Sequence, residues 1–262
     1  MKRLLQIEWQ KLVAYRPFWL LFIFYLALAP TVMLFVDAFD IPFFGKDKPM
    51  EMIYGFPFGW NLATYLSSWF HILLGIIIVI FATNEFKSRT IRQHIIDGMT
   101  RKELFLAKLT ITGFISVFAT LYTVLIAVFG SLIYTGGLEN FSSGFEYVPI
   151  FLFQTFGYMS IAMLISFVIK NSGYAILLYI SVIFVEWLLR NILGFYMSEW
   201  VAVFAPIGMI SKLTPIPFIE EFLKDSGSSK YILNLNERLI YGSLYIITYL
   251  FLTYKLITKR DF

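Results

Sequence analysis

The sequence contains no cysteine, which excludes disulfides, thiolate metal sites and cysteine nucleophiles. It has two histidines, His71 and His94, too few for a histidine-rich metal centre. Charged residues make up 15% of the 262 residues, whereas a soluble globular chain carries about a quarter. From these shortages we expect no metal site in this chain, and catalytic residues are not predicted.

Apolar residues are abundant instead. They make up 59% of the chain and gather in long runs. A bilayer core about 30 Å thick needs roughly 20 apolar residues for each crossing helix. The predicted fold class is therefore an all-α membrane protein, with a single transmembrane domain over residues 1–262. Six spans are expected, at residues 18–36, 61–83, 110–134, 149–169, 174–193 and 237–257.

The segment before the first span, residues 1–17, is basic and partly amphipathic. In a helix, Leu5, Trp9, Leu12 and Val13 would share one face, with polar residues on the others. This pattern predicts an interfacial helix lying on the inner leaflet. The alternative is an ordinary basic flank of the first span.

Lysine and arginine are distributed unevenly between the two sides of the predicted membrane. The two terminal flanks, the 84–109 loop and the turn at Lys170 hold 14 of the 21 basic residues, against six in the three opposite loops, if Lys255 and Arg238 inside the last span are counted with the flank and the loop that they adjoin. Because cytoplasmic loops are enriched in Lys and Arg, both termini are predicted to be cytoplasmic. The net charge of +4 then reflects a multi-pass topology in the inner (cytoplasmic) membrane, and it requires no nucleic-acid partner.

The longest charged stretch is residues 84–109, between the second and third spans. Gly98 is a natural helix stop, and Thr100-x-x-Glu103 is a capping box that opens a new helix. We therefore expect the second span to continue past the membrane, break, turn and lead into the third. A short helix over residues 90–96 should project at the cytoplasmic surface.

The side chains of this short helix suggest a docking surface. Ile91, Ile95 and Ile96 are expected to fill a groove on a partner, with Arg89 and Arg92 at its rim. The alternative is a solvated basic loop without a partner.

The stretch also resembles a known loop, through Glu85, Thr90, Arg92, Ile95-Ile96, Gly98, Thr100-Arg101, Leu104 and Lys108. This pattern is similar to the first cytoplasmic loop of ABC-2-type permeases, the membrane subunits of type V ABC exporters. Arg89 stands where the family commonly has Gly, and Thr100 where it commonly has Ser. The resemblance implies a coupling helix that seats in an ATPase, with these docking residues: Glu85, Arg89, Thr90, Arg92, Ile95, Ile96, Gly98, Thr100, Arg101 and Lys108.

The resemblance also implies partners. The chain's sole Gly-Lys pair, Gly45-Lys46, lacks the rest of a P-loop, so no cofactor is expected in this chain. ATP and Mg²⁺ are expected in a separate ABC ATP-binding subunit, present in two copies. A second permease, identical or paralogous, would complete the pathway within the lipid bilayer. Residues 194–236 resemble the external re-entrant segment that the family carries before its last span.

Among the polar residues inside the predicted spans, three are candidates for the translocation pathway. Glu186 and Arg190 are four residues apart, so they can pair on one helix face. They serve either the pathway or a structural ion pair. His71 is expected to be packed and hydrogen-bonded rather than a ligand.

Together these features predict the permease subunit of an ATP-driven exporter for a lipophilic or amphipathic substrate, such as a peptide antibiotic, a drug or a lipid. The alternative is an ATP-independent secondary transporter or a membrane scaffold. An intramembrane hydrolase is disfavoured, because the sequence has neither a His-Glu-x-x-His nor a Gly-x-Ser-x-Gly motif.

Overall fold

The structure is a computed structural model that describes residues 2–34, 50–88, 90–196, 204–217 and 234–259. The described residues form helices, and no strand occurs among them, as the composition predicts. In chain order the helices are α1 (Lys2–Ala14), α2 (Arg16–Leu34), α3 (Met50–Tyr54), α4 (Phe58–Ser68), α5 (His71–Lys87), α6 (Thr90–Ile96), α7 (Arg101–Thr135), α8 (Tyr147–Val168), α9 (Ser172–Tyr196), α11 (Pro206–Ser211) and α13 (Leu235–Lys259).

The apolar runs form helices long enough to cross a membrane. Within the described residues, five helices pass this test by length and composition: α2, α7, α8, α9 and α13. A sixth span results if α4 and α5 are taken together as one broken crossing. The chain is therefore a multi-pass membrane protein, and each predicted span falls on one of these elements.

The second predicted span is not one continuous helix, which corrects the expectation for residues 61–83. α4 and α5 meet at an angle of 46°. At the junction the backbone N–H groups of Trp69 and Phe70 donate to carbonyls three residues earlier, those of Leu66 and Ser67, at 3.3 and 3.1 Å. Such tight turns interrupt the regular four-residue bonding of an α-helix, so the chain changes direction here.

The helix that contains the third predicted span begins at Arg101, where the capping box predicts a helix start, so it is longer than the predicted span over residues 110–134. α7 is a single helix of 35 residues. At 1.5 Å per residue it is about 50 Å long, whereas a bilayer core is about 30 Å thick. One end of α7 must therefore extend beyond the hydrocarbon core.

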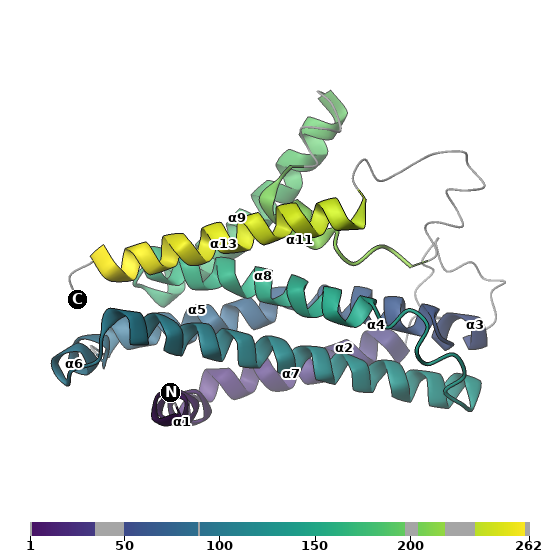
Figure 1. The fold of residues 1–262 in the computed structure, drawn as a ribbon, viewed down its shortest axis with the longest axis horizontal. Coiled ribbons are helices and arrows are strands. Elements are labelled where there is room, and N and C mark those ends of the chain that lie inside the picture. Colours follow the sequence, from purple (N-terminus) through teal and green to yellow (C-terminus); the bar gives the residue numbers. More distant parts are fainter. Residues whose placement is uncertain (1, 35–49, 89, 197–203, 218–233, 260–262) are drawn as a thin grey trace.

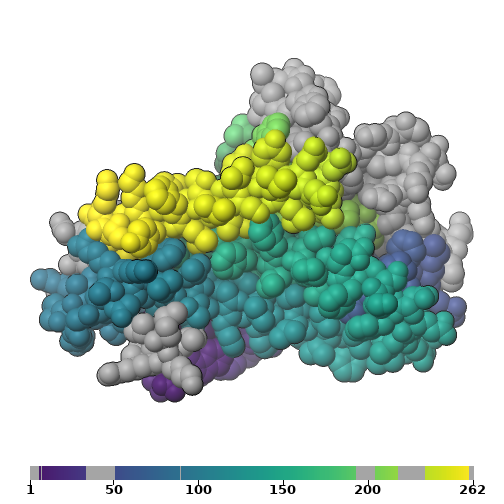
Figure 2. Space-filling model, in the orientation of Figure 1, coloured from purple at the N-terminus to yellow at the C-terminus, as the bar shows by residue number. Residues whose placement is uncertain are grey.

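α8 is the central helix of the bundle. It packs against α4, α5, α7, α9 and α13. In the span of α8, 72% of the residues are buried, whereas in the span of α9 only 11% of the residues are buried. α9 is little buried because it diverges from the other long helices towards its C-terminal end, as Figure 1 shows. In the space-filling view α13 lies lengthwise along one side of the molecule (Figure 2).

The two ends of the bundle differ in what they carry. α1, α6 and the end of α13 lie at one end, and α3 lies at the other (Figure 1). α6 is thus on the same side as both ends of the described chain. This arrangement agrees with an even number of crossings.

The predicted external segment, residues 194–236, is described in part. α9 continues into it as far as Tyr196, and α11 packs against α8, α9 and α13. Pro206 occupies the start of α11. A proline fits there because the first turn of a helix needs no donor from it. Residues 197–203 and 218–233 lie outside the described residues, so the re-entrant course stays a prediction.

Candidate functional site

The candidate site is the junction of α5, α6 and α7, which has the helix–break–helix form that the sequence predicts. α6 spans Thr90–Ile96, the predicted range. Gly98 has a φ of +96°, a left-handed conformation that favours glycine. The N–H of Met99 then donates to the carbonyl of His94 at 2.9 Å, which closes the end of the helix.

The start of α7 is fixed by the predicted capping box. The Glu103 N–H donates to Thr100 Oγ1 at 3.2 Å, and the Thr100 N–H donates to Glu103 Oε2 at 2.8 Å. Two otherwise unpaired donors are thus satisfied. α6 is therefore held between a glycine turn and a capped helix start.

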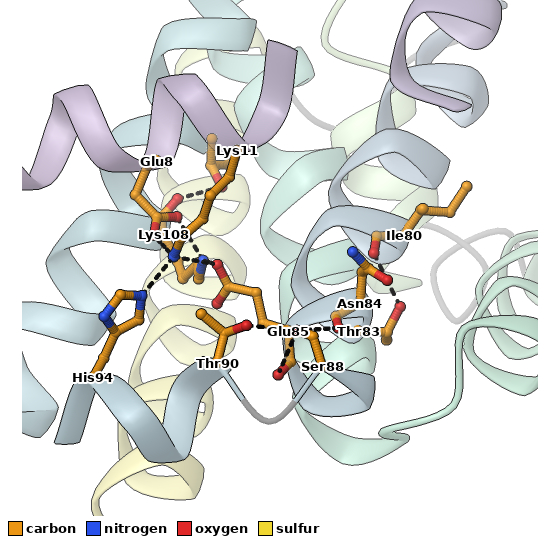
Figure 3. A network of polar contacts seen from close by, with 11 residues as sticks. Glu8, Lys11, Ile80, Thr83, Asn84, Glu85, Ser88, Thr90, His94 and Lys108 are labelled. Atoms are coloured by element: carbon orange, nitrogen blue, oxygen red, sulfur yellow. Dashed lines mark hydrogen bonds and ion pairs between the residues drawn. The ribbon is translucent and has the colours of Figure 1, made fainter. Parts of the chain in front are cut away.

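Beneath this junction lies a network of charged side chains, shown in Figure 3. Lys108 on α7 is at its centre. Its Nζ lies 2.5 Å from Glu8 Oε2 on α1 and 2.6 Å from Glu85 Oε1 on α5. One ammonium group therefore joins α5 and α7 to α1, which is far from both in the sequence.

A second ammonium group, that of Lys11 on α1, extends the network to α6. Its Nζ lies 3.0 Å from Glu8 Oε1 and 3.0 Å from Glu85 Oε1. It also lies 2.8 Å from His94 Nε2. Because an ammonium group can only donate, this contact requires a neutral imidazole that accepts at Nε2. Lys11 thus connects α6 to the two carboxylates.

The network is buried and balanced in charge. Glu8, Glu85 and Lys108 are exposed by 2%, 4% and 3%. Two carboxylates face two ammonium groups, so the buried charges compensate each other. Burial raises the pKa of Glu8, but Lys108 and then Lys11 outweigh it, and the pKa lies below its usual value. Burial, reinforced by Lys11, lowers the pKa of His94.

Glu8, Lys11 and His94 belong to the site but were not predicted from the sequence. Glu8 and Lys11 carry a weak signal, because opposite charges three residues apart in an amphipathic helix can pair. Nothing local in the sequence links them to Glu85 or Lys108, which lie about 75 to 100 positions away.

The predicted docking residues divide into inward and outward groups. Glu85 and Lys108 point inward, into the network. Ile91 is 2% exposed and belongs to the main core, so its expected place in a partner's groove is wrong for this conformation. α6 packs against α5, and Ile91 belongs to the same core cluster as Phe81 and Ala82 of α5.

The outward group remains accessible. Ile96 is 75% exposed, Arg92 is exposed, and Ile95 is half-buried against the core. Gly98 and Thr100 are exposed in the turn. The remaining predicted docking residues are Thr90, half-buried and 2.6 Å from Ser88 Oγ, Arg101, which donates to the Thr258 carbonyl on α13, and Arg89, which lies outside the described residues.

Two of the pathway candidates, Glu186 and Arg190, form hydrogen bonds with α11 and not with each other. Glu186 Oε1 accepts from the Gly208 N–H at 2.6 Å. Arg190 Nη1 donates to Ser211 Oγ at 3.3 Å. No ion pair within 4 Å joins Glu186 to Arg190 among the described residues, so the structural ion pair, one of the two alternatives, is not formed here, and the pathway role stays a prediction. Both ends of α11 are thus attached to α9.

His71 lies in the packed environment that the sequence suggested. It is 1% exposed, and its Nε2 lies 2.9 Å from Thr155 Oγ1. Its ring lies 5.1 Å from those of both Phe151 and Tyr158. A role for His71 in a pathway stays a prediction.

Fold and junction together define a class: a multi-pass helical membrane protein in which a short helix joins two candidate spans. The family model described as "ABC-2 family transporter protein" matches residues 4–186. The chain therefore belongs to the ABC-2 family of transporter membrane proteins. Membership implies a permease of an ABC transporter that associates with an ABC ATP-binding subunit, and the membrane proteins of this family are generally non-catalytic. No curated protein matches the chain.

Proposed function

We propose that this chain is the permease subunit of an ATP-driven exporter, and that α6 is the coupling helix on which a separate ATP-binding subunit docks. One observation carries the proposal: an outward-facing α6, with Ile96 75% exposed, rests on a buried charge network. An exposed apolar side chain at the end of a membrane bundle is suited to a partner's groove.

The network gives α6 a firm attachment. Lys11 contacts His94 on α6 and both carboxylates, and Lys108 ties those carboxylates to α7. Separating such buried charges is costly, so a push on α6 moves α1, α5 and α7 together. Closure of the ATP-binding subunits would in this way become a rigid-body movement of the spans.

The remaining parts of the machine lie outside this chain. ATP and Mg²⁺ belong to two copies of the ATP-binding subunit. A second permease, identical or paralogous, completes a pathway for a lipophilic or amphipathic substrate. The chain lies in the inner (cytoplasmic) membrane with both termini cytoplasmic, because the basic residues concentrate at the α6 end.

The runner-up is an ATP-independent secondary transporter or a membrane scaffold. Transport that persists in vesicles without any ATP-binding subunit would favour this alternative.

The docking proposal is tested with Ile96→Asp, in cells that express the chain together with its ATP-binding subunit. We expect the ATP-binding subunit to stop co-purifying, and transport-coupled ATP hydrolysis to be lost. Leu138→Asp is the matched control, because Leu138 is also an exposed apolar residue, 43% exposed, in the α7–α8 turn. If Ile96→Asp leaves assembly and coupled hydrolysis intact, α6 is not the docking helix.

A further inference from the structure

A cavity of about 620 Å³ opens beside the charge network, between the end of α5, α6 and the turn from α8 to α9. Arg92, on the outward side of α6, lines the cavity, whereas Ile96 does not. Its lining residues are Glu85, Phe86, Lys87, Ile91, Arg92, Lys170, Asn171 and Ser172.

The cavity is cationic. Lys87, Arg92 and Lys170 come from three different segments and are all exposed. Among the described residues, none of the three forms an ion pair with a carboxylate. The Lys170 ammonium lies 5.7 Å from the centre of the Phe86 ring, within the cavity wall. Three cations converging on one hollow favour an anionic ligand.

The carboxylate in the lining, that of Glu85, does not cancel this charge. Its Oε1 already lies 2.6 Å from Lys108 and 3.0 Å from Lys11. Its Oε2 is buried and has no hydrogen-bond partner. A buried acceptor without a donor is costly. A ligand hydroxyl reaching Oε2 would satisfy it, so the ligand chemistry combines an anion with a hydroxyl donor.

The surface next to the cavity is apolar and exposed. Tyr174 and Leu177, in the first turns of α9, are 68% and 63% exposed, and Val168 at the end of α8 is 44% exposed. Exposed apolar side chains on a candidate span are suited to contact with acyl chains. Lys170 lies in the turn between Val168 and Tyr174, at the end of this apolar surface, a position suited to a lipid headgroup.

We propose that this cavity binds the headgroup of an anionic phospholipid of the phosphatidylglycerol type. The phosphate lies among Lys87, Arg92 and Lys170, and a glycerol hydroxyl donates to Glu85 Oε2. The acyl chains lie along the exposed apolar start of α9. The lipid thereby connects α5 and α6 to the α8–α9 turn. Basic hollows between spans on the cytoplasmic side are suited to anionic headgroups.

The test measures lipid binding by the purified full chain in neutral detergent, using native mass spectrometry. Phosphatidylglycerol and phosphatidylcholine with identical acyl chains are the probes. Because each basic residue near a membrane surface contributes about 1 kcal/mol, we expect phosphatidylglycerol to bind roughly tenfold tighter or more. The triple variant Lys87→Gln/Arg92→Gln/Lys170→Gln should lose this preference.

A matched triple variant separates the cavity from overall charge. Lys102→Gln/Lys255→Gln/Lys259→Gln removes the same charge from exposed positions outside the cavity, and it should keep the preference. Phosphatidylmethanol, which has the same charge but no hydroxyl, should bind more weakly than phosphatidylglycerol. Glycerol 3-phosphate, which has no acyl chains, should not compete.

Four results would overturn the proposal. One is the absence of any preference, and another is an equal loss in both triple variants. Competition by glycerol 3-phosphate at equal concentration would indicate a site for free anions. The fourth is a pair of results: the full chain shows no lipid preference, and the ATP-binding subunit stops co-purifying with the cavity variant but not with the matched variant. Together they would indicate that the cavity binds an acidic segment of the ATP-binding subunit. Ile96→Asp leaves the cavity intact, so failure of the docking proposal would be recognised separately.

Discussion

The ammonium group of Lys108 on α7 lies 2.6 Å from the carboxylate of Glu85 on α5, and both side chains are almost fully buried. The two residues bracket the 84–109 loop. Their contact therefore closes the base of the loop, and Glu8 and Lys11 on α1 secure it from the side. α6, which lies within this loop, is therefore supported by contacts among α1, α5 and α7.

The first prediction concerns Lys108, the central residue of the charge network. Lys108→Met leaves Glu8 and Glu85 buried with only Lys11 to compensate two negative charges. Breaking a buried ion pair from one side costs about 3–5 kcal/mol, so the midpoint of unfolding in detergent should fall clearly. The double variant Glu85→Gln/Lys108→Met, which restores the balance between Glu8 and Lys11, should recover part of the loss. An unchanged midpoint in Lys108→Met would contradict a structural role for the network.

The second prediction concerns pH. Burial and then Lys11 lower the pKa of His94 from its usual 6.5, Lys108 acts the same way, and Glu85 and Glu8 oppose them. The folded state then binds fewer protons than the unfolded state near this pH. The resulting stability is present above about pH 6.5 and is lost as the pH falls below it. Unfolding midpoints measured from pH 8 to 5 should show this decline.

The control for the pH prediction is His94→Gln, whose side chain can still accept from Lys11 but does not titrate. In this variant the decline just below pH 6.5 should flatten. Glu8, whose pKa is also lowered, contributes a separate loss as the pH falls below its usual 4.5. An identical decline in wild type and His94→Gln would show that His94 does not titrate between these states.

The third prediction concerns the close approach of α5 and α9. A Cβ added at Gly75 would lie 2.0 Å from the Tyr179 hydroxyl oxygen and 2.3 Å from its Cζ. Gly75→Ala should therefore force the two helices apart and destabilise the chain by about 1–3 kcal/mol. Gly113→Ala is the matched control, because nothing lies within 4 Å of its added Cβ. Equal unfolding midpoints for the two variants would contradict this packing.

The fourth prediction concerns α11, which Glu186 holds through the Gly208 N–H. Because the chain has no cysteine, a single Met209→Cys reports on access to α11, where Met209 is 1% exposed. Glu186→Ala should speed thiol labelling at position 209, since an N–H bond to a carboxylate is lost. Asn191→Ala removes a side chain that bonds within α9, and it should not change the rate. Equal labelling in all three backgrounds would show that Glu186 does not hold α11.

Local patterns predict the local structure of this chain well. The capping box at Thr100 and Glu103 and the stop at Gly98 need information from a few neighbouring residues, and both occur as expected. The apolar runs likewise locate the spans, because the bilayer imposes their length. The bend at Trp69 and Phe70 has no such signal, since neither residue is a glycine or a proline.

The charge network was beyond local patterns. In the sequence, Glu85 and Lys108 look like surface residues of a charged loop. Glu8 looks like a polar residue of an interfacial helix. They are buried because α1 folds back against α7, which is a tertiary contact between segments about 100 residues apart. The inward turn of Ile91 has the same origin, since the choice of its face depends on how α6 lies against α5.

The most direct test of the central claim is cross-linking from α6. A photoreactive amino acid such as benzoylphenylalanine replaces Ile96 in the full chain, in cells that also express the ATP-binding subunit, and the cells are irradiated. The same replacement at Leu138, at the other end of α7, is the control. We predict a covalent adduct with the ATP-binding subunit from position 96 and none from position 138. No adduct from position 96, or equal adducts from both positions, would contradict the assignment of α6 as the coupling helix.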